Sequence, residues 1–194
     1  MDINAWIALL NGAWTTLWVS ALSMLLGVPA GLAVAMLRGA RIPVLGPVLS
    51  LYISVVRAIP MVTLVLFLFV AGSAFELDFD IRVVAVAALT INTTAFNAEI
   101  WRSAFANFPR EQIEAARAAG MTKWLMLRRI QLPQMLITSL PNLVNEMSLL
   151  IKSSPAIAMV GLVDLTRVTI RIGAVTFDPL PPILAAWGIY VLMI

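Results

Sequence analysis

Apolar stretches long enough to cross a membrane recur along this chain of 194 residues. A helix needs about 20 apolar residues to span a hydrocarbon core roughly 30 Å thick. Only 12% of the residues are charged, against about 25% in a typical soluble protein. We therefore predict an all-α integral membrane protein with one transmembrane domain over residues 1–194. The five predicted spans are at about 13–37, 45–71, 83–104, 134–151 and 182–194.

The fifth apolar stretch is too short to cross the membrane by itself. Pro182 to Ile194 is thirteen residues, or about 20 Å of helix against about 30 Å of hydrocarbon. We therefore expect the natural chain to continue past Ile194 with a basic, cytoplasmic end.

Basic residues in the loops determine the predicted orientation. Cytoplasmic loops are enriched in Lys and Arg, and Arg38 and Arg41 directly follow the first span. The next loop carries the acidic residues Glu76, Asp78 and Asp80, whereas the loop at 108–133 is the most basic in the chain. We therefore expect a multi-pass protein whose N-terminus lies outside the cell and whose basic loop lies in the cytoplasm.

The composition excludes several kinds of chemistry. Cys and His are both absent, which removes disulfides, thiol nucleophiles, haem and most transition-metal sites. The GxxxxGK[ST] pattern of a P-loop is missing too, so the chain does not bind ATP by that route. The net charge is only +3, and topology explains the basic loops better than nucleic-acid binding does. We expect no metal, no cofactor, no nucleic-acid partner and no enzymatic activity in this chain.

A polar stripe runs along the fourth predicted span. At 100° per residue its members fall in one arc of the helix, which should face a partner helix or a water-filled path rather than lipid. Two interpretations stay open, a solute path and a seam of hydrogen bonds between helices. A buried carboxylate such as Glu146 favours the path, although it could also pair with a buried arginine. The candidate path residues on this stripe are Asn142, Asn145, Glu146, Lys152 and Ser153.

Another candidate path residue, Arg57, lies near the middle of the second predicted span and three residues before Pro60. Proline removes a backbone donor and breaks a helix. Arg57 beside a broken helix could mark a hinge or contact an anion, or it could pair with Glu99 or Glu146 for structural reasons. Glu99 can also pair with Arg102, because the two are spaced i, i+3 on a helix.

The basic loop predicts two short helices. Residues 112–119 are rich in alanine, the strongest helix former, and Pro109 suits a first helical turn. Gly120 favours a left-handed helix stop, and Thr122 can cap the helix that follows. These features alone describe a helical hairpin lying on the membrane surface.

The spacing within this loop resembles the coupling motif of permease subunits of ABC importers. Glu114-Ala115-Ala116 is followed by three residues and Gly120, then by nine residues and Ile130-Gln131-Leu132-Pro133. In that family the loop forms two short cytoplasmic helices that seat in a cleft of the ATPase subunit. The resemblance implies that Glu114, Ala115, Ala116 and Gly120 couple this chain to an ATPase.

Further motifs resemble the branch of the family that imports polar amino acids and opines. They are YISVVRAIP at 52–60, FNAEIWR at 96–102 and the Pro…Asn…Leu-Lys stretch at 141–152. One motif departs from the branch, which usually has Asp-Thr-Ser-Leu where this chain has Ser-Ser-Pro-Ala at 153–156. The implied solute is small and polar, foremost an amino acid, with an opine or another amino-acid derivative as the alternative.

The resemblance also implies an assembly of the type I importer kind in a bacterial cytoplasmic membrane. Its parts are two permease subunits, identical or paralogous, an ATP-binding cassette ATPase dimer that uses the ATP, and an external solute-binding protein. Two rival functions compete with this one. A passive channel or membrane anchor would work without ATP, and an intramembrane enzyme would need a nucleophile or a metal site.

Overall fold

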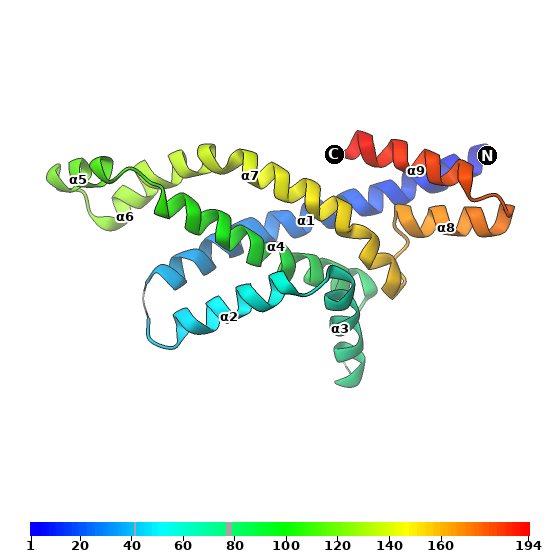
Figure 1. Ribbon diagram of the computed structural model, residues 1–194, viewed down its shortest axis with the longest axis horizontal. Helices are drawn as coiled ribbons and strands as arrows, with labels where there is room; N and C mark the ends of the chain where they lie inside the picture. Colours follow the sequence, from blue (N-terminus) through cyan, green and yellow to red (C-terminus); the bar gives the residue numbers. More distant parts are fainter. Residues whose placement is uncertain (41, 77–78) are drawn as a thin grey trace.

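The computed structural model describes residues 1–40, 42–76 and 79–194, and the elements within them are helical (Figure 1). Arg41 and Asp78, which contribute to the predicted orientation, lie outside the described residues. The elements are α1 (Ile3–Gly39), α2 (Leu45–Ala58), α3 (Met61–Ala74), α4 (Ile81–Ala106), α5 (Arg110–Ala118), α6 (Lys123–Met126), a π-helical turn (Leu127–Gln131), α7 (Leu132–Ser153), a 3-10 turn (Ser154–Val160), α8 (Leu165–Thr176) and α9 (Leu180–Met193).

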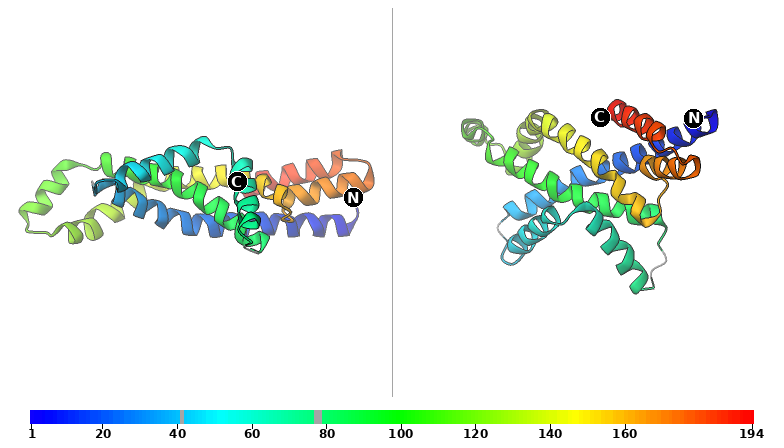
Figure 2. Two further views of the ribbon diagram at one scale, coloured as in Figure 1. Left: turned by 90° about the horizontal axis from the view of Figure 1, so that it is seen from below. Right: turned by 45° about the vertical axis from the view of Figure 1, so that its right-hand side comes forward.

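Three long helices, α1, α4 and α7, form the body of an elongated bundle (Figures 1 and 2). The short helices α5 and α6 project from one end of this bundle, at the left of Figure 1. The other end holds the N-terminus, α8 and the start of α9. The basic loop is therefore separated from α8 by the whole length of the molecule.

Two helices, α1 and α4, are each long and apolar enough to cross a membrane. Up to four spans result if two bent pairs each count as one, α2 with α3 and the segment Lys123–Val160 with α8. The helix α9 is apolar but has only 14 residues. This count is below the predicted five because two of the candidate spans are bent pairs of helices and α9 is short.

The second predicted span, 45–71, is two helices instead of one. The axes of α2 and α3 meet at 112°, and Ile59 between them is extended, with φ −81° and ψ 130°. Pro60 has no N–H to continue the helix, and its ring pushes the preceding residue out of the helical region. Helix α3 then packs on the 3-10 turn and on α4, so tertiary contacts hold the sharp bend.

Two further boundaries differ from the prediction. The first helix begins at Ile3 and not near residue 13, because the Asp2 side chain accepts a hydrogen bond from the Ala5 N–H at 2.9 Å and caps it. The segment between 164 and 181 has no predicted helix, yet α8 lies there. Asp164 starts α8 by accepting from the Arg167 N–H at 2.8 Å. By contrast, α4, α7 and α9 end within two residues of their predicted bounds.

The closest helix packing in the bundle joins α1 to α4. Gly27 and Gly31, a GxxxG pair, face Thr93 and Asn97 of α4. A Cβ atom added at Gly31 would lie 2.7 Å from the Asn97 Cβ and 2.9 Å from the Ala98 backbone nitrogen. Small residues let two helix backbones approach in this way, so the glycines determine where the polar residues of α4 lie.

Replacing Gly31 with alanine should destabilise the bundle. The added methyl group meets backbone that cannot move freely, and overpacking of this kind costs about 1–3 kcal/mol. Gly39→Ala is the matched control, because a Cβ there has no heavy atom within 4 Å. We expect a lower thermal midpoint in detergent for Gly31→Ala and an unchanged or higher one for Gly39→Ala. Equal midpoints for the two variants would contradict the close α1–α4 contact.

Candidate translocation pocket and coupling loop

Two cavities follow one another between α4 and α7, and each contains polar side chains from the predicted stripe. The cavity farther from the basic loop, here the distal cavity, has a volume of about 270 Å³. The proximal cavity, nearer that loop, has about 370 Å³. The distal cavity is lined by residues that include Arg57, Met61, Asn92, Phe96, Glu146 and Ser153, and the proximal cavity by residues that include Ser103, Gln134, Thr138, Ser139 and Asn142.

The distal cavity contains one cation and one carboxylate. Arg57 is exposed at the end of α2, and its Cζ lies 5.1 Å from the centre of the Phe96 ring, a distance at which a ring face attracts a guanidinium group. Glu146 on α7 is only 6% exposed. Among the described residues the two side chains are not within ion-pair distance of each other. The cavity therefore offers both charges to a ligand.

Glu146 is held in place by a chain of polar groups on α4. The Thr93 hydroxyl donates to Glu146 Oε1 at 3.4 Å, and the Asn97 amide donates to the same hydroxyl oxygen at 2.9 Å. Thr93 and Asn97 are both fully buried, and they face Gly27 and Gly31 of α1. The packing of Gly27 and Gly31 against α4 therefore helps to position the Glu146 carboxylate on α7.

The structure brings together some of the predicted path residues and separates others. Arg57, Glu146 and Ser153 line the distal cavity, and Asn142 lines the proximal one. Asn145 and Lys152 are exposed on another side of α7 and line neither cavity. The bond from Thr93 to Glu146 supports the seam interpretation at one position, whereas Thr138 and Ser153 donate to carbonyl groups of their own helix.

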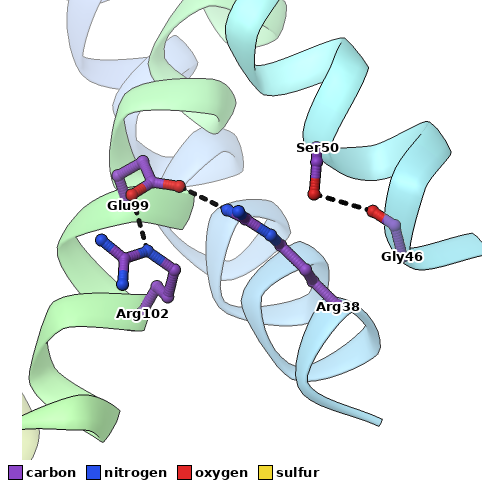
Figure 3. Close-up of polar contacts among 5 residues, drawn as sticks. All are labelled: Arg38, Gly46, Ser50, Glu99 and Arg102. Carbon is purple, nitrogen blue, oxygen red and sulfur yellow. Dashed lines mark hydrogen bonds and ion pairs between the residues drawn. The ribbon is translucent and has the colours of Figure 1, made fainter. Parts of the chain in front are cut away.

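Glu99 forms a different ion pair from the one considered for Arg57. Its carboxylate binds Arg102 at 2.7 Å, as the i, i+3 spacing predicts, and also Arg38 of α1 at 2.5 Å (Figure 3). The contact with Arg38 was not predicted, because it joins residues 61 positions apart in the chain. Glu99 is shared by Arg38 and Arg102 and does not pair with Arg57. Arg57 lines the distal cavity instead.

The basic loop has the helix stop and the helix cap that its sequence predicts, although its second helix is not separate and continues into α7. Gly120 has φ +74°, its N–H donates to the Arg117 carbonyl at 2.9 Å, and the Met121 N–H donates to the Ala116 carbonyl at 3.0 Å. These two bonds form the Schellman motif that ends α5. The Thr122 hydroxyl accepts from the Leu125 N–H at 3.3 Å and begins α6.

The loop is attached to the bundle by apolar and polar contacts. Ile113 and Ile130 pack against the cluster that contains Trp101, Phe108 and Met135. The Gln134 amide donates to the Gln112 side-chain oxygen at 2.9 Å, which joins α7 to α5. Of the predicted coupling residues, Ala116 is buried, whereas Glu114, Ala115 and Gly120 are exposed.

The π-helical turn makes the connection from α6 to α7 continuous. Residues from Lys123 to Ser153 are helical without interruption. Pro133 follows this turn and has no N–H, and its ring would crowd the carbonyl four residues earlier in a regular α-helix. A widened turn accommodates that ring. The helix that begins at Lys123 therefore runs without a break to the part of α7 that carries Glu146.

Three residues at this site were missed by the sequence analysis as contributors to the pocket, namely Phe96, Thr93 and Asn97. Phe96 and Asn97 appeared only within the motif at 96–102. Thr93 and Asn97 are spaced i, i+4 in an apolar span, so they share a helix face. This i, i+4 spacing of two polar residues was the signal in the sequence that could have identified Thr93 and Asn97.

Comparisons with known proteins agree on one family. Residues 27–194 match the family described as binding-protein-dependent transport system inner membrane component. A probable amino-acid ABC transporter permease of Bacillus subtilis (strain 168) is 31% identical over 92% of this chain and 79% of its own length. The nopaline transport system permease of Agrobacterium fabrum (strain C58 / ATCC 33970) is 29% identical over 97% of this chain and 82% of its length. A solved structure of an amino acid ABC transporter with histidines has 30% identity and a TM-score of 0.88, and covers 100% of this chain and 92% of the other.

These matches, together with the helical bundle and its projecting loop, define a class of membrane transport protein. The chain belongs to the family of binding-protein-dependent transport system inner membrane components. It is the permease, or transmembrane subunit, of an ABC importer. The family is one of transporter permeases and not of enzymes, which argues against the intramembrane enzyme.

Proposed function

We propose that this permease imports a zwitterionic solute of the amino-acid or opine kind and that the distal cavity binds it. The observation that carries the proposal is the pair of Arg57 and Glu146, which line one cavity without pairing to each other. An amino acid has a carboxylate for the arginine and an ammonium group for the glutamate. Bonds between charged partners are about twice as strong as neutral ones, so two of them would select a solute with both groups.

The energy for transport comes, in this proposal, from an ATPase dimer bound at Glu114, Ala115, Ala116 and Gly120. Three of these residues are exposed at the projecting end of the molecule, where a soluble partner has access. Closure of the ATPase dimer would move α5 and α6, and the continuous helix from Lys123 would carry that motion to Glu146. ATP is bound and used by the partner, and this chain holds no cofactor.

A second permease subunit and an external binding protein complete the assembly that we propose. Asn145 and Lys152 are exposed on α7 in the single chain, although polar groups facing lipid are costly. A second permease subunit packed on this side would enclose them, so that they face a shared path. The binding protein would dock at the opposite end from the basic loop, with the N-terminus outside the cell.

The proposal is tested by uptake into proteoliposomes that contain the permease with its ATPase and its binding protein. We expect uptake of a labelled amino acid to require ATP inside the vesicle. We also expect analogues that lack either the amino or the carboxyl group to compete at least tenfold more weakly, since each loses a charged bond of about 1.5–3 kcal/mol. Equal competition by the neutralised analogues would contradict a charge-selective cavity, and ATP-independent uptake would contradict coupling.

A further inference from the structure

A third cavity, of about 650 Å³, lies between the end of the bundle and the basic loop. Four cationic side chains line it, Arg38 from α1, Arg102 from α4, Arg117 from α5 and Lys123 from α6. We refer to it as the basic cavity. Its walls come from α1, from α4 and from the segment that contains α5 and α6, three parts of the chain that are remote in the sequence, so the cavity is produced by the tertiary structure and not by a local run of charge.

The basic cavity has an excess of positive charge. Among the described residues its lining contains no Asp or Glu, and the carboxylate of Glu99, which is not part of the lining, is shared by Arg38 and Arg102 (Figure 3). Among the described residues, Arg117 and Lys123 have no ion-pair partner. Four cations and one carboxylate leave three positive charges around the cavity. An anion is the ligand that would balance them.

Apart from Gln131, the remaining wall of the basic cavity is formed by apolar residues and glycine, and an apolar wall favours some anions over others. Met36, Phe105 and Met126 contribute to it. Arg38 and Arg102 lie near the ends of α1 and α4, the two helices long and apolar enough to cross a membrane, which is the level of lipid headgroups. A small soluble anion gains nothing from contact with an apolar wall. A phospholipid has a phosphate that can bind the cations and acyl chains that can contact the apolar side chains. Basic pockets between membrane helices bind such headgroups.

We propose that the basic cavity binds the phosphate headgroup of an anionic phospholipid. The lipid connects the ends of α1 and α4 to α5 and α6, because its phosphate is held by cations from all four helices. It therefore stabilises the loop against the bundle. This inference does not depend on which solute the permease carries.

The test is native mass spectrometry of the permease purified with its ATPase, in detergent containing dioleoylphosphatidylglycerol or dioleoylphosphatidylcholine. Each basic residue near a membrane contributes about fivefold to the binding of anionic lipid. The double variant Arg117→Gln, Lys123→Gln should therefore bind phosphatidylglycerol on the order of 25-fold more weakly. The matched control is Arg128→Gln, Arg129→Gln, which removes two exposed cations that do not line the cavity. We expect the control to change affinity by less than about twofold and phosphatidylcholine binding to stay the same.

Three outcomes would overturn the proposal. Equal losses in the two double variants would mean general attraction to the surface and no built site. Inorganic phosphate that binds with the same dependence on Arg117 and Lys123, while phosphatidylglycerol does not bind, would mean a soluble anion. Loss of the ATPase from the cavity variant, with lipid binding unchanged, would mean that the cations contact the partner protein. A thermal midpoint in phosphatidylcholine that matches the wild type excludes misfolding as the cause of any loss.

Discussion

Replacing Gly120 with valine should uncouple ATP hydrolysis from uptake. Gly120 has φ +74°, where an L-residue costs about 1–2 kcal/mol and a β-branched one fares worst. The space around the residue is open, with no heavy atom within 4 Å of an added Cβ, so backbone strain is the whole effect. The valine would relieve that strain by leaving the left-handed conformation. The two bonds that end α5 would then break, and α6 would change its direction.

The measurement compares the rate of ATP hydrolysis with the rate of uptake in the reconstituted complex. We expect uptake to fall at least tenfold while hydrolysis continues, since a change of 1.4 kcal/mol corresponds to a factor of ten. Gly120→Asn is the control, because asparagine tolerates the left-handed region. It should retain most of the coupled uptake. Normal coupled uptake by Gly120→Val would show that this turn does not transmit the motion.

Replacing Glu146 with glutamine should nearly abolish uptake while leaving the fold intact. Glutamine has the shape of glutamate and can still accept the hydrogen bond from Thr93. The variant loses only the negative charge that we propose for the solute ammonium group. A bond to a charged group contributes about 1.5–3 kcal/mol, so the uptake rate should fall about 10- to 100-fold.

The uptake assay for Glu146→Gln uses an excess of binding protein, so that delivery of the solute does not limit the rate. Ser148→Ala is the control on the same helix, because the Ser148 hydroxyl donates only to the Val144 carbonyl at 3.1 Å. It should transport at the wild-type rate. If Glu146→Gln also transports at that rate, the carboxylate serves packing alone and the distal cavity is not the solute site.

The basic loop shows how much can be predicted when the contacts are local. Gly120, Thr122 and the alanine-rich stretch before them lie within eleven residues, and the bonds that fix them join residues three to five apart. The left-handed stop and the helix cap were therefore predictable from residue type. The same reasoning succeeded for Glu99 with Arg102, which lie on one helix.

The distal cavity shows the opposite case. Arg57 and Glu146 are 89 positions apart in the chain, and each carried several predicted partners. Their common cavity depends on the 112° bend at Pro60 and on how α4 packs between α1 and α7. The polar stripe of α7 was predicted as a unit, yet its residues divide between two cavities and an exposed side.

The sequence by itself determined the membrane class of this protein, its helical elements and the coupling motif, because these depend on composition, periodicity and local backbone preference. The helix α8 was the exception, because no helix was predicted between 164 and 181, where capping by Asp164 and packing on α1 and α9 stabilise one. Only the tertiary structure decided which charges meet. Ion pairs and cavities form between helices distant in the chain, and their geometry depends on close packing at contacts such as Gly31 with Asn97.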